Sequence, residues 1–119
     1  MKQFRFEDFE IWKEGMNLLK LMFRLSQSCS KRQQFELADQ IRRASISITN
    51  NIAEGSGSAS AKDFSHFLNI SRRSLYECAN LVFITHQEGI ISEEEKNLLI
   101  GKLVILGKKI TMFQKSLRC

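Results

Sequence analysis

The chain of 119 residues is long enough for one domain with a single core, which we expect to span residues 1–119. Its 18 Lys and Arg exceed its 13 Asp and Glu, giving a formal net charge of +5, and its 43% hydrophobic content excludes an intrinsically disordered chain. No apolar run approaches the ~20 residues of a membrane span, and the start MKQFRFEDFE lacks the apolar core of a signal peptide. We therefore expect a cytoplasmic protein with no membrane partner.

Proline is absent from the chain, so no proline interrupts a long helix. A first helix is predicted over about 7–27, followed by a connection at 26–32, because apolar residues recur at spacings of three and four. Its core-facing seam is predicted to be Phe9, Trp12, Met16, Leu19 and Phe23. A second helix is predicted over 34–53, and Gly55 is predicted to end it in the left-handed conformation that a residue without Cβ accepts. Its buried stripe is predicted to be Leu37, Ile41, Ala44, Ile48 and Ile52.

A third helix is predicted over 61–87, beginning at a cap on Ser60 and ending at Glu88-Gly89. A fourth begins after Ser92, whose side chain is expected to form a capping box with Glu95. The seam of the third is Phe64, Leu68, Ser71, Leu75, Cys78 and Val82, and that of the fourth is Leu99, Leu103, Leu106, Ile110, Phe113 and Leu117. Four helices joined by short loops predict an all-α, antiparallel, up-down-up-down four-helix bundle.

Two of these helices carry a second apolar stripe that the bundle core does not need. The stripe residues recur every seven positions and are predicted to face outward as an oligomer interface: Ile11, Leu18 and Leu25 on the first helix, and Leu98, Ile105 and Met112 on the fourth. The alternative is that wider burial within the bundle absorbs these side chains.

Basic residues gather on the second, third and fourth helices. The candidate nucleic-acid-binding residues are Arg42, Arg43, Arg72, Arg73, Lys102, Lys108, Lys109 and Lys115. A turn centred near Gly57 would place the two Arg pairs side by side, where they would bind phosphate unless Asp39 and Glu77 neutralise them within the bundle. The simpler alternative is that acids early and bases late in each helix only complement the helix dipole.

The motifs of the chain resemble a known family. The segments FEDFxxW (6–12), QIRRA (40–44), NIAEG (51–55) and KDFxxFLxISxxSLYE (62–77) resemble the four helix bundle, or 23S rRNA-intervening sequence, proteins. Asn50 and Arg73 depart from that pattern, which has a small residue and a Gly at these places. The resemblance implies a homo-oligomer, a pentamer, without catalytic residues, and one relative is the accessory subunit of a retroelement reverse transcriptase.

Asn51, Glu54 and Gly55 of NIAEG are interpreted as a structural motif. The side chains of Asn51 and Glu54 are expected to bond backbone groups of the turn or of the first turn of the third helix, where N–H groups lack partners.

No residue pattern points to catalysis, a metal or another cofactor. His66 and His86 are twenty residues apart on one helix, about 30 Å, so they cannot share a metal. Cys29, Cys78 and Cys119 lack metal or redox spacing and are expected to be reduced thiols. We therefore expect neither an enzyme nor a small-molecule substrate.

Two functions remain open at this point. One is an oligomeric nucleic-acid-binding or ribonucleoprotein accessory protein, whose partner would be RNA or DNA. The other is a structural or protein-interaction module whose partner would be a reverse transcriptase or another protein. A membrane-surface protein is the weaker third, because the bundle needs the fourth helix. Most aromatic residues lie on helix seams, so binding to nucleic acid is expected to be directed to phosphate instead of to bases.

Overall fold

The computed structural model describes residues 1–117, which form four long helices after a short 3-10 turn. The elements are η1 (Arg5–Asp8), α1 (Glu10–Lys31), α2 (Phe35–Ser56), α3 (Ala61–Gln87) and α4 (Glu93–Ser116). There is no strand among residues 1–117, and the predicted all-α four-helix fold is confirmed. Within this part of the chain, no helix has an apolar stretch long enough to cross a bilayer.

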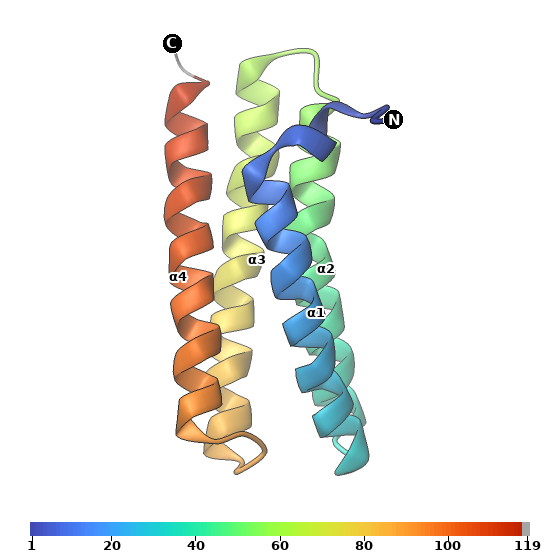
Figure 1. Cartoon of the computed structure of the whole chain (residues 1–119), viewed down its shortest axis with the longest axis vertical. Coiled ribbons are helices and arrows are strands. Elements are labelled where there is room, and N and C mark those ends of the chain that lie inside the picture. Colours follow the sequence, from blue (N-terminus) through green and yellow to red (C-terminus); the bar gives the residue numbers. More distant parts are fainter. Residues whose placement is uncertain (118–119) are drawn as a thin grey trace.

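Successive helices run in opposite directions along a molecule of 45 × 25 × 23 Å (Figure 1). α2 packs closely on both α1 and α3, whereas α4 packs mainly on α3 and more loosely on α1. Two hydrogen bonds join α2 to α3. The hydroxyls of Ser47 and Ser74 lie 2.7 Å apart, and the Ser71 hydroxyl donates to the Ile48 carbonyl oxygen at 2.8 Å.

Local sequence signals set the ends of α3 and α4. The Ser60 hydroxyl accepts from the Asp63 backbone N–H at 3.1 Å, and Ser92 forms the expected capping box with Glu95. Gly89, just after α3, has a φ of +73°, which a residue without Cβ adopts at little cost. The predicted bounds of α3 are confirmed, as is the start of α4.

The first helix differs from its predicted bounds. Residues 5–8 form the separate turn η1, and α1 then continues to Lys31 through most of the segment predicted to be a connection. Cys29 is fully buried, and its carbonyl oxygen accepts from the Gln34 backbone N–H at 2.9 Å. Burial of this last turn therefore stabilises the helix beyond its predicted end at about residue 27.

The predicted outward stripe of α1 is wrong. Ile11, Leu18 and Leu25 are each 4% exposed and lie in the core with Met22. The predicted seam is instead half-buried or exposed at Phe9, Trp12, Met16, Leu19 and Phe23. α1 is apolar on two sides, and the face that also carries Gly15 allows the closer approach. A Cβ at Gly15 would lie only 2.9 Å from Cγ2 of Thr49 on α2.

Gly55 does not end α2 in the left-handed conformation. The helix continues to Ser56 and ends at Gly57, which has a φ of −85°. Gly55 is buried within the last turn, where a Cβ would lie 2.7 Å from the Phe67 Cβ and 2.8 Å from the Phe64 Cδ1. The residue is needed because α2 and α3 approach too closely here for any side chain.

Gly55→Ala should therefore destabilise the fold, although alanine is the better helix former. Overpacking costs about 1–3 kcal/mol, while the gain in helix propensity is about 1 kcal/mol. Gly101→Ala is the matched control, because its added Cβ would meet nothing within 4 Å, and it should stabilise the protein by about 0.5–1 kcal/mol. Urea unfolding followed by circular dichroism measures both. Equal stabilisation by the two substitutions would contradict the close contact at Gly55.

Candidate functional site

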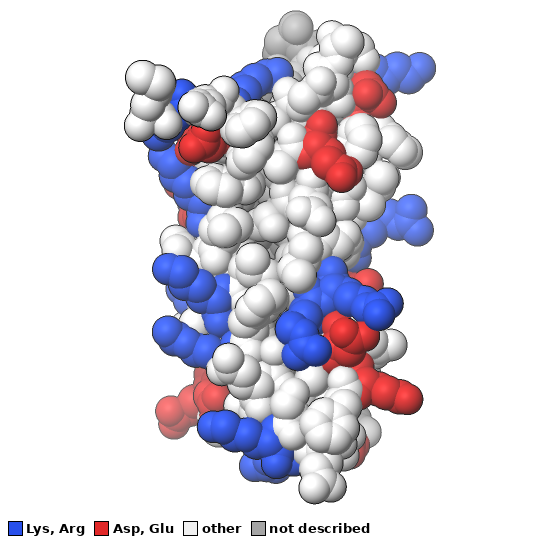
Figure 2. All heavy atoms as spheres, turned by 90° about the vertical axis from the view of Figure 1, so that its right-hand side faces the viewer, with Lys and Arg blue, Asp and Glu red and all other residues white. Residues whose placement is uncertain are grey.

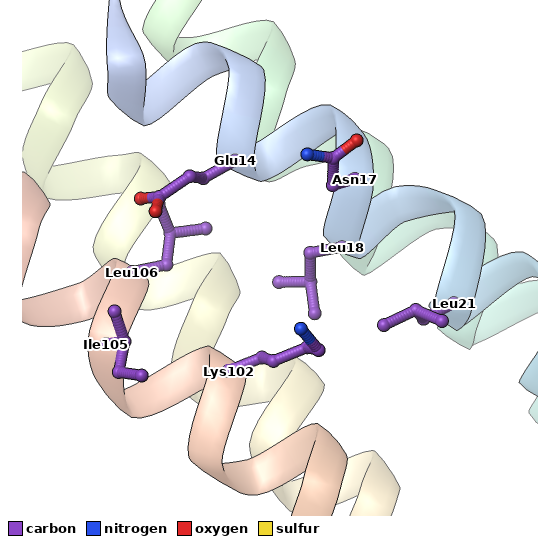
Figure 3. A pocket seen from close by; sticks show the side chains of 7 residues that line it. All are labelled: Glu14, Asn17, Leu18, Leu21, Lys102, Ile105 and Leu106. Atoms are coloured by element: carbon purple, nitrogen blue, oxygen red, sulfur yellow. The ribbon is translucent and has the colours of Figure 1, made fainter.

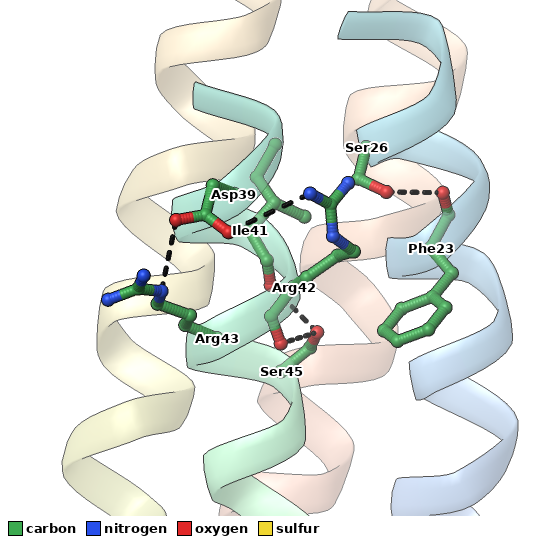
Figure 4. Close-up of polar contacts among 7 residues, drawn as sticks. All are labelled: Phe23, Ser26, Asp39, Ile41, Arg42, Arg43 and Ser45. Atoms are coloured by element: carbon green, nitrogen blue, oxygen red, sulfur yellow. Dashed lines mark hydrogen bonds and ion pairs between the residues drawn. The ribbon is translucent and has the colours of Figure 1, made fainter. Parts of the chain in front are cut away.

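Arg42 and Arg43 are paired within α2. Nη2 of Arg42 lies 3.7 Å from one carboxylate oxygen of Asp39, and Nε of Arg43 lies 3.0 Å from the other. Figure 4 shows Arg42 turned toward Ser26 of α1 and Arg43 turned the other way. Asp39 thus partners both arginines, as the sequence allowed, and their charge is partly neutralised inside the bundle.

The two Arg pairs do not form one cluster. Ser47 lies level with Ser74, so the midpoint of the α2–α3 pairing falls at about residue 60 and not at Gly57. This shift follows from α2 continuing to Ser56, and it moves Arg42 and Arg43 more than a turn away from Arg72 and Arg73. Figure 2 looks onto the side of the molecule that α1 and α2 occupy, where Lys and Arg gather along both edges and acids lie beside several of them.

Lys109 is held between two acids of α1. Its Nζ lies 3.0 Å from Glu10 Oε1 and 2.7 Å from Glu14 Oε1, so it joins α4 to α1. Hydrogen bonds from Glu14 and then Glu10 raise the pKa of Lys109 above its ordinary 10.5. Lys109 is therefore less available to a phosphate than a solvated lysine, which sequence spacing alone did not reveal.

The remaining predicted cations lie on α3 and α4. Arg73, Lys102, Lys108 and Lys115 are exposed, and none of them makes an ion pair within residues 1–117. Arg72 is half-buried and donates to the side-chain oxygen of Gln114 at 3.2 Å, a neutral partner that leaves its charge unbalanced. We call Arg72, Arg73, Lys108 and Lys115 the α3–α4 basic surface. Lys102 lies on the opposite side of α4, toward α1.

The apolar stripe of α4 faces outward, as predicted. Leu98, Ile105 and Met112 are 56%, 53% and 68% exposed. Ile105 and Lys102 line a hollow of about 200 Å³ between α1 and α4, next to Leu21 (Figure 3). A second hollow of about 190 Å³ lies beside Leu98 and is again lined by Leu21. The α1 contribution to this surface therefore comes from half-buried Leu21, which the sequence reading did not select.

A groove of about 380 Å³ between α3 and α4 was also missed. It is lined by Arg72, Leu75, Tyr76, Ala79, Phe83, Ile100, Leu103, Val104, Gly107 and Lys108. Tyr76 and Phe83, seven residues apart on α3, are exposed along it. Both lie off the predicted α3 seam, and that position was the signal that could have identified them as surface residues.

The motif residues Asn51 and Glu54 differ from their predicted roles. The Asn51 amide donates to the Ser47 carbonyl oxygen at 2.8 Å and lies 3.0 Å from the Ser47 hydroxyl, which in turn contacts Ser74. Asn51 thus supports the α2–α3 contact from within α2 and does not reach the first turn of α3. Glu54 is exposed, and no hydrogen bond or ion pair of its carboxylate occurs in the described part of the chain. Its predicted structural role is wrong.

Cys29 and Cys78 are buried free thiols, and burial raises the pKa of Cys78 to about 12. A thiol with so high a pKa carries almost no reactive thiolate at neutral pH. Cys119 lies outside the described residues. Over residues 1–117 no group of three or more His, Cys, Asp or Glu side chains is arranged to hold a metal ion.

The family model for 23S rRNA-intervening sequence proteins matches residues 7–112. The chain belongs to this family. A search of curated proteins returned no match. In this 23S rRNA-intervening sequence protein, the family-like segment NIAEG supplies three separate packing roles: Asn51 supports Ser47, Ile52 is fully buried, and Gly55 admits α3.

Replacing Lys109 should lower the thermal stability of the protein in a pH-dependent manner. A lysine whose pKa is raised by folding stabilises the folded state below its ordinary pKa, and this stabilisation disappears as pH rises through the raised value. Wild type should therefore melt above Lys109→Gln at pH 8, and the difference should shrink above pH 10.5. Lys20→Gln, at an exposed α1 lysine without an ion pair in residues 1–117, is the control. A difference that is constant between pH 8 and 11.5 would contradict the assigned ion pairs.

Proposed function

We propose that this member of the 23S rRNA-intervening sequence protein family is a non-enzymatic homo-oligomer that binds RNA or DNA through its α3–α4 basic surface. The observation that carries the proposal is that Arg73, Lys108 and Lys115 are exposed without ion pairs in residues 1–117, beside Arg72 with its neutral partner. From Lys96 to the end of α4 the sequence contains no acid. Such a surface attracts polyanions, and Arg and Lys form charge-assisted hydrogen bonds with phosphate oxygens.

The chemistry of this surface determines what kind of recognition to expect. Arginine and lysine donors contact phosphate oxygens, which are the same at every nucleotide, so binding through them carries no sequence code. The proposed compartment is the cytoplasm.

The exposed stripe of α4 supports self-association. Leu98, Ile105 and Met112 stand out from the surface, and Leu98 and Ile105 line two hollows at the junction of α1 and α4. Exposed apolar side chains next to hollows of this kind are a feature of protein interfaces. A ring of five subunits is our choice of assembly, by the family resemblance. Such a ring would repeat the basic surface once per subunit and so raise the number of phosphates contacted.

Ile105→Glu should dissociate the oligomer, because an unpaired carboxylate would be desolvated in the interface. Ile46→Glu, at a partly exposed isoleucine of α2, is the matched control and should leave the assembly intact. Light scattering at micromolar concentration, with circular dichroism to confirm folding, measures both. A monomeric wild type would contradict self-association, and an Ile105→Glu oligomer would place the interface elsewhere.

Removal of Arg73, Lys108 and Lys115 should reduce both the affinity for nucleic acid and its salt dependence. Each phosphate contact contributes about −0.9 to the log–log salt slope on duplex DNA and about −0.7 on single strands. We expect the triple Gln variant to flatten the slope by up to about three contacts per subunit. Lys109 is left intact because it joins α4 to α1.

The matched control replaces Lys13, Lys20 and Lys31 of α1 with Gln, which removes the same charge. Filter binding to mixed-sequence RNA and duplex DNA is the measurement. Equal slopes in both triple variants would contradict the assigned surface.

The second candidate function is a protein-interaction module without nucleic-acid binding. The same exposed α4 stripe favours it, since a different protein, such as a reverse transcriptase, could cover Leu98, Ile105 and Met112 in place of another copy. Wild-type protein that shows no binding to RNA or DNA at low salt would favour this function.

A further inference from the structure

We infer that the groove between α3 and α4 binds an unpaired base of a single-stranded nucleic acid, with the base stacked on Tyr76 and the adjoining phosphates on Arg72, Arg73 and Lys108. This inference rests on the proposed nucleic-acid binding and adds to it a preference for unpaired strands. The sequence predicted that most aromatic residues belong to the core, whereas Tyr76 lies at the surface.

Tyr76 is the exposed ring of the groove. Its side chain is 71% exposed, and its hydroxyl makes no hydrogen bond within the described residues. The groove beside it is apolar, with Leu75 and Leu103 buried at its base and Val104 on its α4 side. A nucleobase has two flat apolar faces. Stacking one of them on an aromatic ring removes that face and the contacted face of the ring from water.

Cations surround this ring on two sides. Arg72 and Arg73 precede Tyr76 by one helical turn and share with it a hollow of about 410 Å³. Lys108 lines the same groove from α4. Glu77 is the neighbouring acid, and three cations outweigh its charge. The groove therefore combines an apolar face with positive charge at its rim, which complements a polymer of bases and phosphates.

Arg72 is positioned by a buried amide. Gln114 is 8% exposed, its nitrogen donates to the Ser65 carbonyl oxygen at 2.9 Å, and its oxygen accepts from Nη1 of Arg72. Because the first bond fixes the orientation of the amide, its oxygen faces the guanidinium. The other N–H groups of Arg72 remain for a phosphate, so the fork is held in place without being neutralised.

Unpaired bases fit this site better than duplex or protein. In a duplex the base faces are stacked on one another, so only the phosphates could reach Arg72, Arg73 and Lys108. A second copy paired face to face would bring the same three cations against them and be repelled. At the other end of the groove Nζ of Lys96 lies 5.8 Å from the centre of the Phe83 ring, which is 50% exposed compared with 71% for Tyr76. Tyr76 is therefore the stacking residue.

The test compares Tyr76→Leu with Tyr76→Phe in the full-length protein. The probes are a fluorescein-labelled ten-nucleotide oligoadenylate and a duplex of the same length, followed by fluorescence anisotropy. Loss of one stacked base should weaken single-strand binding by roughly 5- to 150-fold in Tyr76→Leu. Tyr76→Phe keeps the ring and should bind the single strand as the wild type does. Duplex affinity and the salt slope should not change in either variant. Phe35→Leu, which removes an exposed ring on α2, is the matched control.

Each other outcome overturns a different statement. A wild type that binds neither probe overturns the proposed function and this inference with it. A wild type that binds the single strand with the same affinity as Tyr76→Leu overturns only the stacking site. If Tyr76→Leu remains folded but changes the oligomer size measured by light scattering, the groove binds a second copy and the inference is wrong.

Discussion

The close packing of α2 on α3 is the contact on which the rest of the structure depends. At one end Gly55 lies so near Phe64 and Phe67 that no side chain would fit, and in the middle the hydroxyls of Ser47 and Ser74 share a hydrogen bond. Together these contacts set the register of the two helices. That register places Arg42 and Arg43 away from Arg72 and Arg73, and so it separates a pair that shares the Asp39 carboxylate from a pair without an acidic partner in residues 1–117.

α4 is attached by fewer and more specific contacts. On the α3 side Gln114 bonds Ser65 and Arg72, and on the α1 side Lys109 bonds Glu10 and Glu14. Between these contacts the helix leaves a groove along α3 and two hollows along α1. Its apolar residues and its lysines therefore remain accessible along both edges, which is why we assign self-association and nucleic-acid binding to this helix.

The lysines and arginines of the chain are not equivalent, although a net charge of +5 treats them alike. Arg43 and Lys109 lie within 3.0 Å of carboxylates, and Lys109 joins α4 to α1 through its pairs. Arg72 has a neutral partner that orients it, and Arg73 and Lys108 have no ion pair within residues 1–117. The cations that have a carboxylate partner are therefore distinct from those that remain free to contact a polyanion. Tyr76 adds an apolar face beside this second group.

Sequence alone determined the features that depend on neighbours within a few residues. The four-helix class, the bounds of α3 and the capping box at Ser92 all follow from periodicity and local capping. The family motifs likewise identified the family correctly over most of the chain.

Only the tertiary structure decided which of two apolar faces of α1 enters the core, why Gly55 is a glycine, which acids hold Lys109, and that Tyr76 lies along a groove shared with α4. Each of these depends on a side chain from another helix, and the position of that helix is set by packing between residues far apart in the chain. Periodicity shows that a helix has an apolar face, but the neighbour that can approach most closely determines which face is buried.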